Sequence, residues 1–280
     1  SSIASLIEND VEQKSIEQPL ISALLNSEPV SIPSLDERLN SPSAGGFFSS
    51  WIPVFGFSTN SVKSQDTPEF YVEKLTQRNI AAKSLAERLQ SLRVTLSTAK
   101  LSWIKNFIDC KGLAALEFVL ERYTIGIKKN MSRNTDHDGR IQSECVRCLR
   151  VLLNTELGYN QVSKSSSLIN CIVFCMHTPN NKLRSQVADV LAALCVLSLE
   201  GHKLVLDAFS DFRQVHEEKF RFQYLMNTLK IGETEDSVSM EYKSACLSLV
   251  NAIVTSPEDV EERMMLRKEF ERRGLTDLFL

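Results

Sequence analysis

From Pro68 onward, apolar residues recur every three or four positions, which is the spacing of one face of an α-helix. The pattern begins at Asp66-Thr67-Pro68-Glu69, which combines a polar capping residue, a proline suited to the first helical position and an early acid. We expect a break near Asn79 and a further helix start near Ser102-Trp103. The apolar positions of the first stretch are Tyr71, Leu75, Leu85, Leu89, Leu92 and Leu96.

Beyond this stretch, strongly apolar helical segments alternate with polar ones. Residues 112–123 predict an apolar helix, whereas the polar residues 128–140 predict a loop. Three similar apolar segments then follow at 148–154, 190–196 and 246–252, offset by 42 and then 56 residues. The first offset falls in the range of armadillo and HEAT repeats, about 40–47 residues. Shorter apolar helices are expected beside these segments, at 168–176, 203–212, 220–229 and 260–272.

The width of the apolar faces indicates the fold class. Leu183, Val187 and Val190 belong to an apolar arc so wide that their helix must be covered by neighbours on two sides. Stacked three-helix units supply this cover and generate a curved solenoid, whose inner surface is a groove suited to helices or extended peptides. The sequence therefore predicts an all-α protein, an armadillo-like helical solenoid preceded by a small helical segment and a mostly irregular N-terminal stretch.

Three regions follow from this pattern: residues 1–67 as an N-terminal flank, 68–140 as the first helices and 141–280 as the repeat region. The flank starts as a broken amphipathic pattern and continues as a linker rich in Ser, Pro, Asn and Gly. It contains an apolar island at 46–57 whose aromatic side chains are costly to leave in water. We expect the island to dock on the protein's own surface or on a partner.

Charge and composition exclude several classes of protein. The 280 residues carry a net charge of −3 with an isoelectric point near 5.9, so no basic field favours nucleic acid or anionic membranes. No apolar run approaches the ~20 residues that span a bilayer. Six of the seven cysteines lie in apolar helical stretches, which favours a reduced cytosolic compartment over a disulfide scaffold.

Candidate chemistry is sparse, because the sequence lacks a phosphate loop, a dinucleotide-binding glycine pattern, HExxH and GxSxG. Cysteine is the one metal candidate: Cys145 and Cys148 form a CxxC pair, and Cys171 and Cys175 lie four residues apart. Zinc needs four converging thiolates, whereas these pairs lie within helical patterns, where buried cysteine acts as a small hydrophobe. The residues alone predict a non-catalytic binding module without cofactor or metal, with a peptide-carrying armadillo adaptor and a zinc protein or enzyme as alternatives.

Several segments, taken in order and spacing, resemble the GTPase-binding and armadillo-repeat region of diaphanous-related formins, which includes the formin homology 3 or diaphanous inhibitory region. The resemblance covers about 68–280. Its first part comprises LQSLRVTL at 89–96, LSWIKNF at 101–107 and GLAAL at 112–116. Its later part comprises ECVRCLR at 144–150, LNTELG at 153–158, LAALC at 191–195, Gly201-His202, Arg221-Phe222, LVNAI at 249–253, RMMLRKEF at 263–270 and Gly274-Leu275.

This resemblance implies that a Rho-family GTPase in its GTP form binds between the first helical segment and the first repeat. The first surface would comprise Leu89, Leu92, Arg93, Val94 and Leu96. The loop that reads the GTPase would comprise Asn154, Thr155 and Glu156. The family often has Asn-Asn-Lys at this loop, so Glu156 reverses a charge and the identity of the GTPase stays open. Core packing is the alternative role of the three leucines.

The resemblance also implies an intramolecular partner, an amphipathic autoregulatory helix from the formin's own C-terminus. Its docking site would begin at Asn181-Lys182 and run through Gln186, Val187 and Val190, although the two valines are equally compatible with core packing. GTPase binding would compete with this helix and release actin nucleation and elongation, with actin contacted only through the C-terminal half. Such a protein is expected in the cytoplasm, recruited by the GTPase to the cell cortex or to actin structures.

Overall fold

The computed structural model describes residues 66–124, 136–230 and 237–276. The predicted flank up to residue 65, with its apolar island, lies outside the described residues. Within the described ranges every regular element is a helix, which confirms the predicted all-α class. The helices are α4 (Pro68–Thr76), α5 (Ala82–Thr98), α6 (Leu101–Asp109), α7 (Gly112–Thr124), α8 (Asp136–Leu153), α9 (Glu156–Val162), α10 (Ser166–Phe174), α11 (Asn181–Leu197), α12 (Leu199–Val215), α13 (Gln223–Lys230), α14 (Ser237–Thr255) and α15 (Val260–Glu271).

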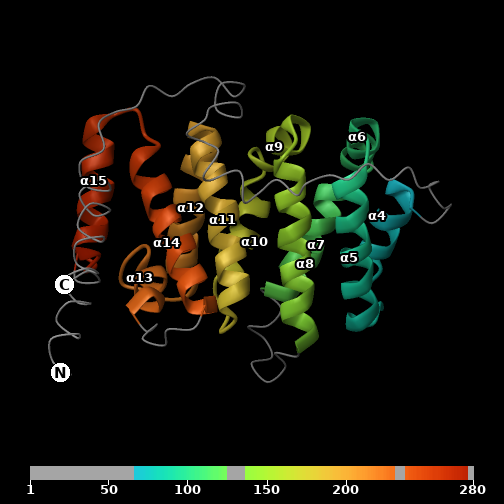
Figure 1. Ribbon diagram of the computed structural model, residues 1–280, viewed down its shortest axis with the longest axis horizontal. Coiled ribbons are helices and arrows are strands. Elements are labelled where there is room, and N and C mark those ends of the chain that lie inside the picture. The colour runs from blue at the N-terminus through green and yellow to red at the C-terminus, as the bar shows by residue number, and fades with distance from the viewer. Residues whose placement is uncertain (1–65, 125–135, 231–236, 277–280) are drawn as a thin grey trace, which may run out of the picture.

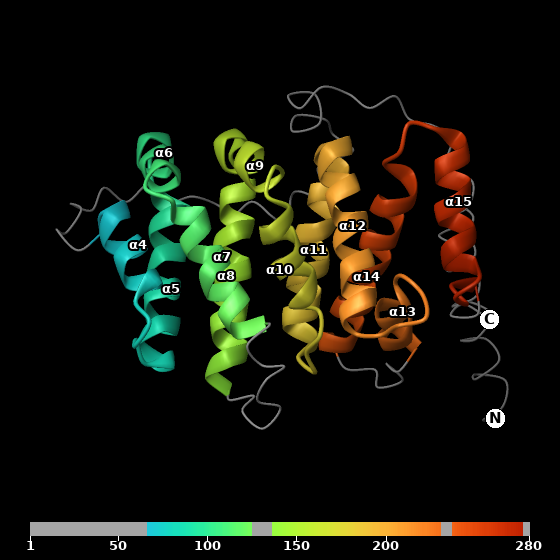
Figure 2. The same ribbon diagram turned by 180° about the vertical axis from the view of Figure 1, so that it is seen from behind.

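The helices stack side by side in two rows (Figures 1 and 2). The front row consists of α5, α8, α11 and α14, each in contact with the next, and the back row of α4, α7, α10 and α12, connected in the same way. In chain order α6–α8, α9–α11 and α12–α14 form successive three-helix units whose third helix lies in the front row. The three similar apolar segments begin in α8, α11 and α14, so the predicted helical solenoid is confirmed.

The first helix begins where the sequence places it. The Thr67 hydroxyl accepts a hydrogen bond from the backbone N–H of Phe70 at 3.3 Å, and Pro68 occupies the first helical position. The break near Asn79 is also confirmed, because α4 ends at Thr76 and α5 begins at Ala82. The start of α4 therefore follows from local capping chemistry, whereas α5 begins after Ala81 without a side-chain cap.

Two helices differ from the prediction. α8 begins at Asp136, inside the predicted loop 128–140; its first turn carries no apolar residue before Ile141, so apolar spacing does not reveal it. Arg140 in this turn donates to the side-chain oxygen of Gln90 on α5 at 2.8 Å, which helps to order it. α9 is absent from the prediction because it has only seven residues, too few to show a helical period.

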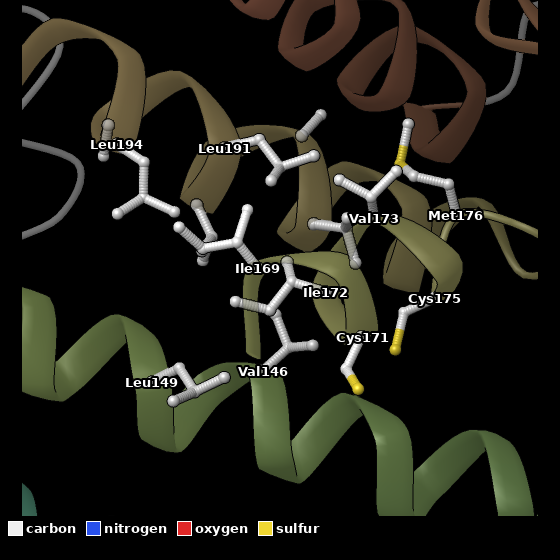
Figure 3. Packing of buried hydrophobic residues seen from close by; sticks show 14 of the residues in the cluster. Val146, Leu149, Ile169, Cys171, Ile172, Val173, Cys175, Met176, Leu191 and Leu194 are labelled. Atoms are coloured by element: carbon white, nitrogen blue, oxygen red, sulfur yellow. The ribbon is translucent and has the colours of Figure 1, made fainter. Parts of the chain in front are cut away.

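The core fills the space between the two rows. Val146 and Leu149 of α8 pack toward Ile172 of α10 and toward Leu191 and Leu194 of α11 (Figure 3). Twelve of the seventeen residues of α11 are buried, since α8 and α14 flank it in the front row and α10 and α12 lie behind it. The core is thus continuous from one three-helix unit to the next.

The four cysteines of the two candidate pairs are part of this core, as core packing predicts. Cys145, Cys148, Cys171 and Cys175 are all buried among aliphatic side chains. Burial raises the pKa of each thiol, that of Cys171 to about 12, so these cysteines are held as neutral thiols. Among the described residues, no group of three or more His, Cys, Asp or Glu could hold a metal ion.

Glycine closes the turns between successive units. Gly158 and Gly201 each lie three residues after a capping side chain, Thr155 or Ser198, which accepts a hydrogen bond from the glycine N–H. A Cβ at Gly158 would overlap the backbone carbonyl of Leu152, and one at Gly201 would meet the carbonyl of Leu194. The first helix of a unit can therefore approach the end of the preceding helix only because these residues are glycines.

We predict that Gly158→Ala destabilises the protein by roughly 2–4 kcal/mol, because the added methyl group must displace backbone atoms. Gly139→Ala is the matched control, since a Cβ there meets nothing within 4 Å and alanine favours a helix by about 0.5–1 kcal/mol over glycine. Chemical denaturation followed by circular dichroism measures both free energies of unfolding. Equal stability of the two variants would contradict the role assigned to this turn.

Candidate functional site

The candidate residues on α5 divide into a buried set and an accessible set. Leu89, Leu92 and Leu96 are at most 2% exposed, because the apolar stripe of α5 faces its neighbours α8 and α4. These leucines adopt the alternative role, core packing, and offer no surface to a partner in this conformation. Val94 is 52% exposed on the outer side of the same helix. Of this set, Arg93 and Val94 are the residues within reach of a partner.

Arg93 belongs to a charged contact that joins α5 to α8. Its Nε donates to Oε2 of Glu144 at 2.8 Å, and Nη1 of Arg147 donates to Oε1 of the same carboxylate at 3.0 Å. Glu144 is only 6% exposed, and the two guanidinium groups supply hydrogen bonds to both of its carboxylate oxygens. Arg93 therefore fixes the relative position of the two helices, besides lining their outer surface.

The candidate loop 154–156 is a tight turn between α8 and α9. Asn154 is exposed at its start, and Glu156 is exposed as the first residue of α9, so Glu156 lies in a helix and not in a loop. The Thr155 hydroxyl accepts from the N–H of Gly158 at 3.1 Å and donates to the carbonyl of Leu152 at 2.8 Å. Thr155 thus caps the helix, while its two neighbours point to solvent.

The α5 surface and this turn lie along one edge of the solenoid. Helices α6 and α9, which follow α5 and α8 in the chain, lie along the same long edge of the stack, the upper edge in Figure 1, and contact each other. The C-terminal end of α5, which carries Val94, and the 154–156 turn therefore face the same side. A single globular partner can reach both.

The candidates on α11 are largely inaccessible. Val187 and Val190 are fully buried, because α11 is flanked by α8 and α14 and backed by α10 and α12. Gln186 is 8% exposed and accepts a hydrogen bond from the Ser143 hydroxyl of α8 at 2.8 Å. Asn181 accepts from its neighbour Arg184 at 3.1 Å, whereas Lys182 is exposed. The two valines are thus core residues, and Lys182 is the accessible charge of this set.

Sequence reasoning missed a polar stripe that connects these positions. On α8 it comprises Arg140, Ser143, Arg147 and Arg150 and ends at Asn154, and on α11 it continues with Lys182, Gln186 and Asp189. The signal was available, since these residues recur every three or four positions opposite the apolar stripe. We call this area the front-row surface.

Asp189 and Arg150 meet across α8 and α11 in the middle of the front-row surface. An oxygen of Asp189 lies 3.9 Å from a guanidinium nitrogen of Arg150. Burial raises the pKa of Asp189 to about 6, against the opposing effect of Arg150 and with a further increase from the charge of Glu241. Burial also lowers the pKa of Arg150. A carboxylate that is costly to ionise gains from any further cation or N–H donor, so this position suits a polar contact from a partner.

These features make up a candidate binding surface. The front-row surface offers arginine and lysine side chains and one partly buried carboxylate on α8 and α11, and α5 adds the exposed Val94. None of the helices in the described ranges is long and apolar enough to cross a bilayer.

Known proteins are similar to this sequence over most of its length. The family model of the Diaphanous GTPase-binding domain matches residues 54–196, and that of the Diaphanous FH3 domain matches residues 202–279. Formin-F of Dictyostelium discoideum is 37% identical over 217 residues, covering 77% of this chain and 17% of Formin-F. Human Disheveled-associated activator of morphogenesis 1 is 31% identical over 224 residues, or 74% of this chain and 20% of that protein.

A third relative is protein diaphanous homolog 3 of Rattus norvegicus, 28% identical over 223 residues, or 79% of this chain and 18% of that protein. The chain thus spans a fifth or less of the length of these relatives. Together the two family models cover the helices from α4 to α15. They confirm the resemblance that the short sequence segments indicate. The chain therefore belongs to the diaphanous-related formins and carries the GTPase-binding and FH3 domains of that family's regulatory region.

Proposed function

We propose that this chain senses a Rho-family GTPase and, in its absence, holds the formin's own C-terminal autoregulatory helix. The GTP-bound protein would contact Val94 and the α8–α9 turn, and the autoregulatory helix would lie on the front-row surface around Lys182 and Asp189. Binding of the helix would keep the actin-assembling half inactive. The protein would act in the cytoplasm and be recruited by the GTPase to the cell cortex or to actin structures.

One observation carries the GTPase assignment: the C-terminal part of α5, with the exposed Val94, leads into α6, and the turn with the exposed Asn154 leads into α9, and α6 and α9 contact each other. Both lie in the range matched by the Diaphanous GTPase-binding model. An exposed apolar residue beside exposed polar groups is typical of the centre and rim of a protein–protein interface. The ion pair of Arg93 and Glu144 holds the two parts in register before the partner arrives, which lowers the entropic cost of binding.

Charge and accessibility support the autoregulatory site. Lys182 is exposed at the start of α11, and Asp189 lies two turns further along the same helix beside Arg150. A helix laid across the front row could reach both charges and the arginines of α8. The two proposed sites share α8, so a GTPase at the α8–α9 turn and a helix on the α8 stripe would compete for neighbouring surface.

Release of the autoregulatory helix needs only a GTPase whose affinity for the open form exceeds its affinity for the closed form. A ligand that binds the open form alone shifts the equilibrium between the two forms by the free energy of its own binding. Closure of a few kcal/mol is overcome when the GTPase favours the open form by more than that amount. A GTPase that binds both forms equally would have no effect, however tight its binding.

We predict that Asn154→Asp weakens binding of the GTP-bound partner about tenfold, because the aspartate cannot donate a hydrogen bond and adds a second negative charge beside Glu156. The measurement is titration of the chain with Rho-family proteins loaded with a GTP analogue or with GDP. Asn251→Asp, an exposed substitution of the same kind on α14, should leave affinity unchanged. Binding that ignores the nucleotide, or an identical loss in both variants, would rule out this site.

The autoregulatory contact is tested by Lys182→Glu. We predict that about tenfold more of this variant is needed to inhibit actin assembly by the formin's own C-terminal half, because the substitution reverses a charge on the proposed docking face. Lys203→Glu, exposed on α12 of the back row, is the matched control. Substituting Val187 would be uninformative because that side chain is fully buried. Inhibition that is equally strong with both lysine variants would place the helix elsewhere.

A further inference from the structure

The back row contains a hollow that the proposed function does not use. A pocket of about 290 Å³ opens between α7, α10 and α12, which lie side by side on that face (Figure 2). Its floor is one stripe of α10, made of Ser167, Asn170, Cys171 and Phe174. These positions span two helical turns, about 10 Å along the axis. We call this hollow the back-row groove.

The floor and the walls of the groove differ in charge. α10 contains no charged residue, whereas α7 carries Glu117 and Glu121 and α12 carries Asp207 and Asp211, each pair four residues apart and hence on one face of its helix. Glu121 and Asp211 line the pocket itself. Within the described part of the chain, none of these four carboxylates forms a salt bridge. The groove is thus neutral along its base and negative along both sides.

Local contacts keep this arrangement in place. The side-chain amide of Asn170 donates to Oδ2 of Asp211 at 2.8 Å, which ties the floor to the α12 wall. The negative charges of Glu117 and Glu121 are felt at the floor of the groove. Burial raises the pKa of the Cys171 thiol, and these two charges raise it further. Val215, at the end of α12, is 47% exposed and gives the same wall an apolar end near Phe174.

We propose that the back-row groove binds a basic amphipathic helix of a partner protein. Its lysine or arginine side chains would pair with Glu121 and Asp211 on the two walls, and its small apolar residues would contact Phe174 and Val215. The partner helix matches the groove in charge and in length. Its side chains at positions i, i+3, i+4 and i+7 extend over two helical turns, which is the length of the floor on α10. Negative walls disfavour nucleic acids and anionic lipid surfaces, which leaves a cationic peptide as the fitting ligand.

The test uses the whole 280-residue chain and a fluorescein-labelled helical probe of about 14 residues, built from alanine and leucine with lysines every fourth position. We expect saturable binding by fluorescence anisotropy. Combining Glu121→Gln with Asp211→Asn should weaken binding about tenfold, since two charge-assisted contacts are lost while the new amide oxygen can still accept from Asn170. A probe with glutamine in place of lysine should bind at least as weakly.

Glu87→Gln combined with Glu271→Gln is the control, because it removes two exposed acids from other surfaces and changes the net charge equally. An equal loss in the control pair would mean unspecific attraction to an acidic protein and would overturn the proposal. So would displacement of the probe by spermine at the same concentration of positive charge, since spermine has no apolar face. Retained binding of the GTPase in the Glu121 and Asp211 variant shows that this site stands or falls independently of the proposed function.

Discussion

Burial of α11 between four other helices is the constraint on which the rest of the structure depends. A helix with twelve of seventeen residues buried has almost no solvent-facing side, so it cannot fold without α8, α10, α12 and α14 around it. Those helices belong to three successive units, and each unit therefore needs its neighbours. The same burial restricts where partners can bind, because α11 leaves unburied only Asn181, Lys182, Arg184, Asp189 and Val196.

The connections between units make the surface rigid as well as stable. Gly158 and Gly201 let each unit start in contact with the end of the preceding one. Polar contacts then join helices that are distant in sequence: the Nε2 atom of His202 on α12 lies 2.9 Å from the carbonyl oxygen of Ile253 on α14, and Glu144 joins α8 to α5. A surface assembled from several units is thus set before a partner arrives, which lowers the entropic cost of binding.

Most helices could be predicted from local signals, such as the Thr67 cap and the recurrence of leucine, and only segments without an apolar period, such as α9, escaped. The candidate site could be predicted less well. Apolar spacing shows which residues share one face of a helix, but it does not show which neighbouring helix covers that face. Leu92 is fully buried, yet Val94 two positions later is 52% exposed. Gln186 was expected at a surface, but Ser143 supplies its hydrogen bond inside the α8–α11 contact. Such pairings depend on which helices become neighbours, and one helix's own sequence does not contain that information.

The two proposed binding faces on opposite rows would have different consequences for regulation. The proposed partners of the front row would share α8 and would therefore exclude one another, which is what a switch requires. A basic helix in the back-row groove would touch α7, α10 and α12 and leave the front-row surface free. A ligand shifts a conformational equilibrium only when its affinity differs between the two states. Since the floor and both walls of the groove belong to the back row, its partner would bind open and closed forms alike and would localise the protein without activating it.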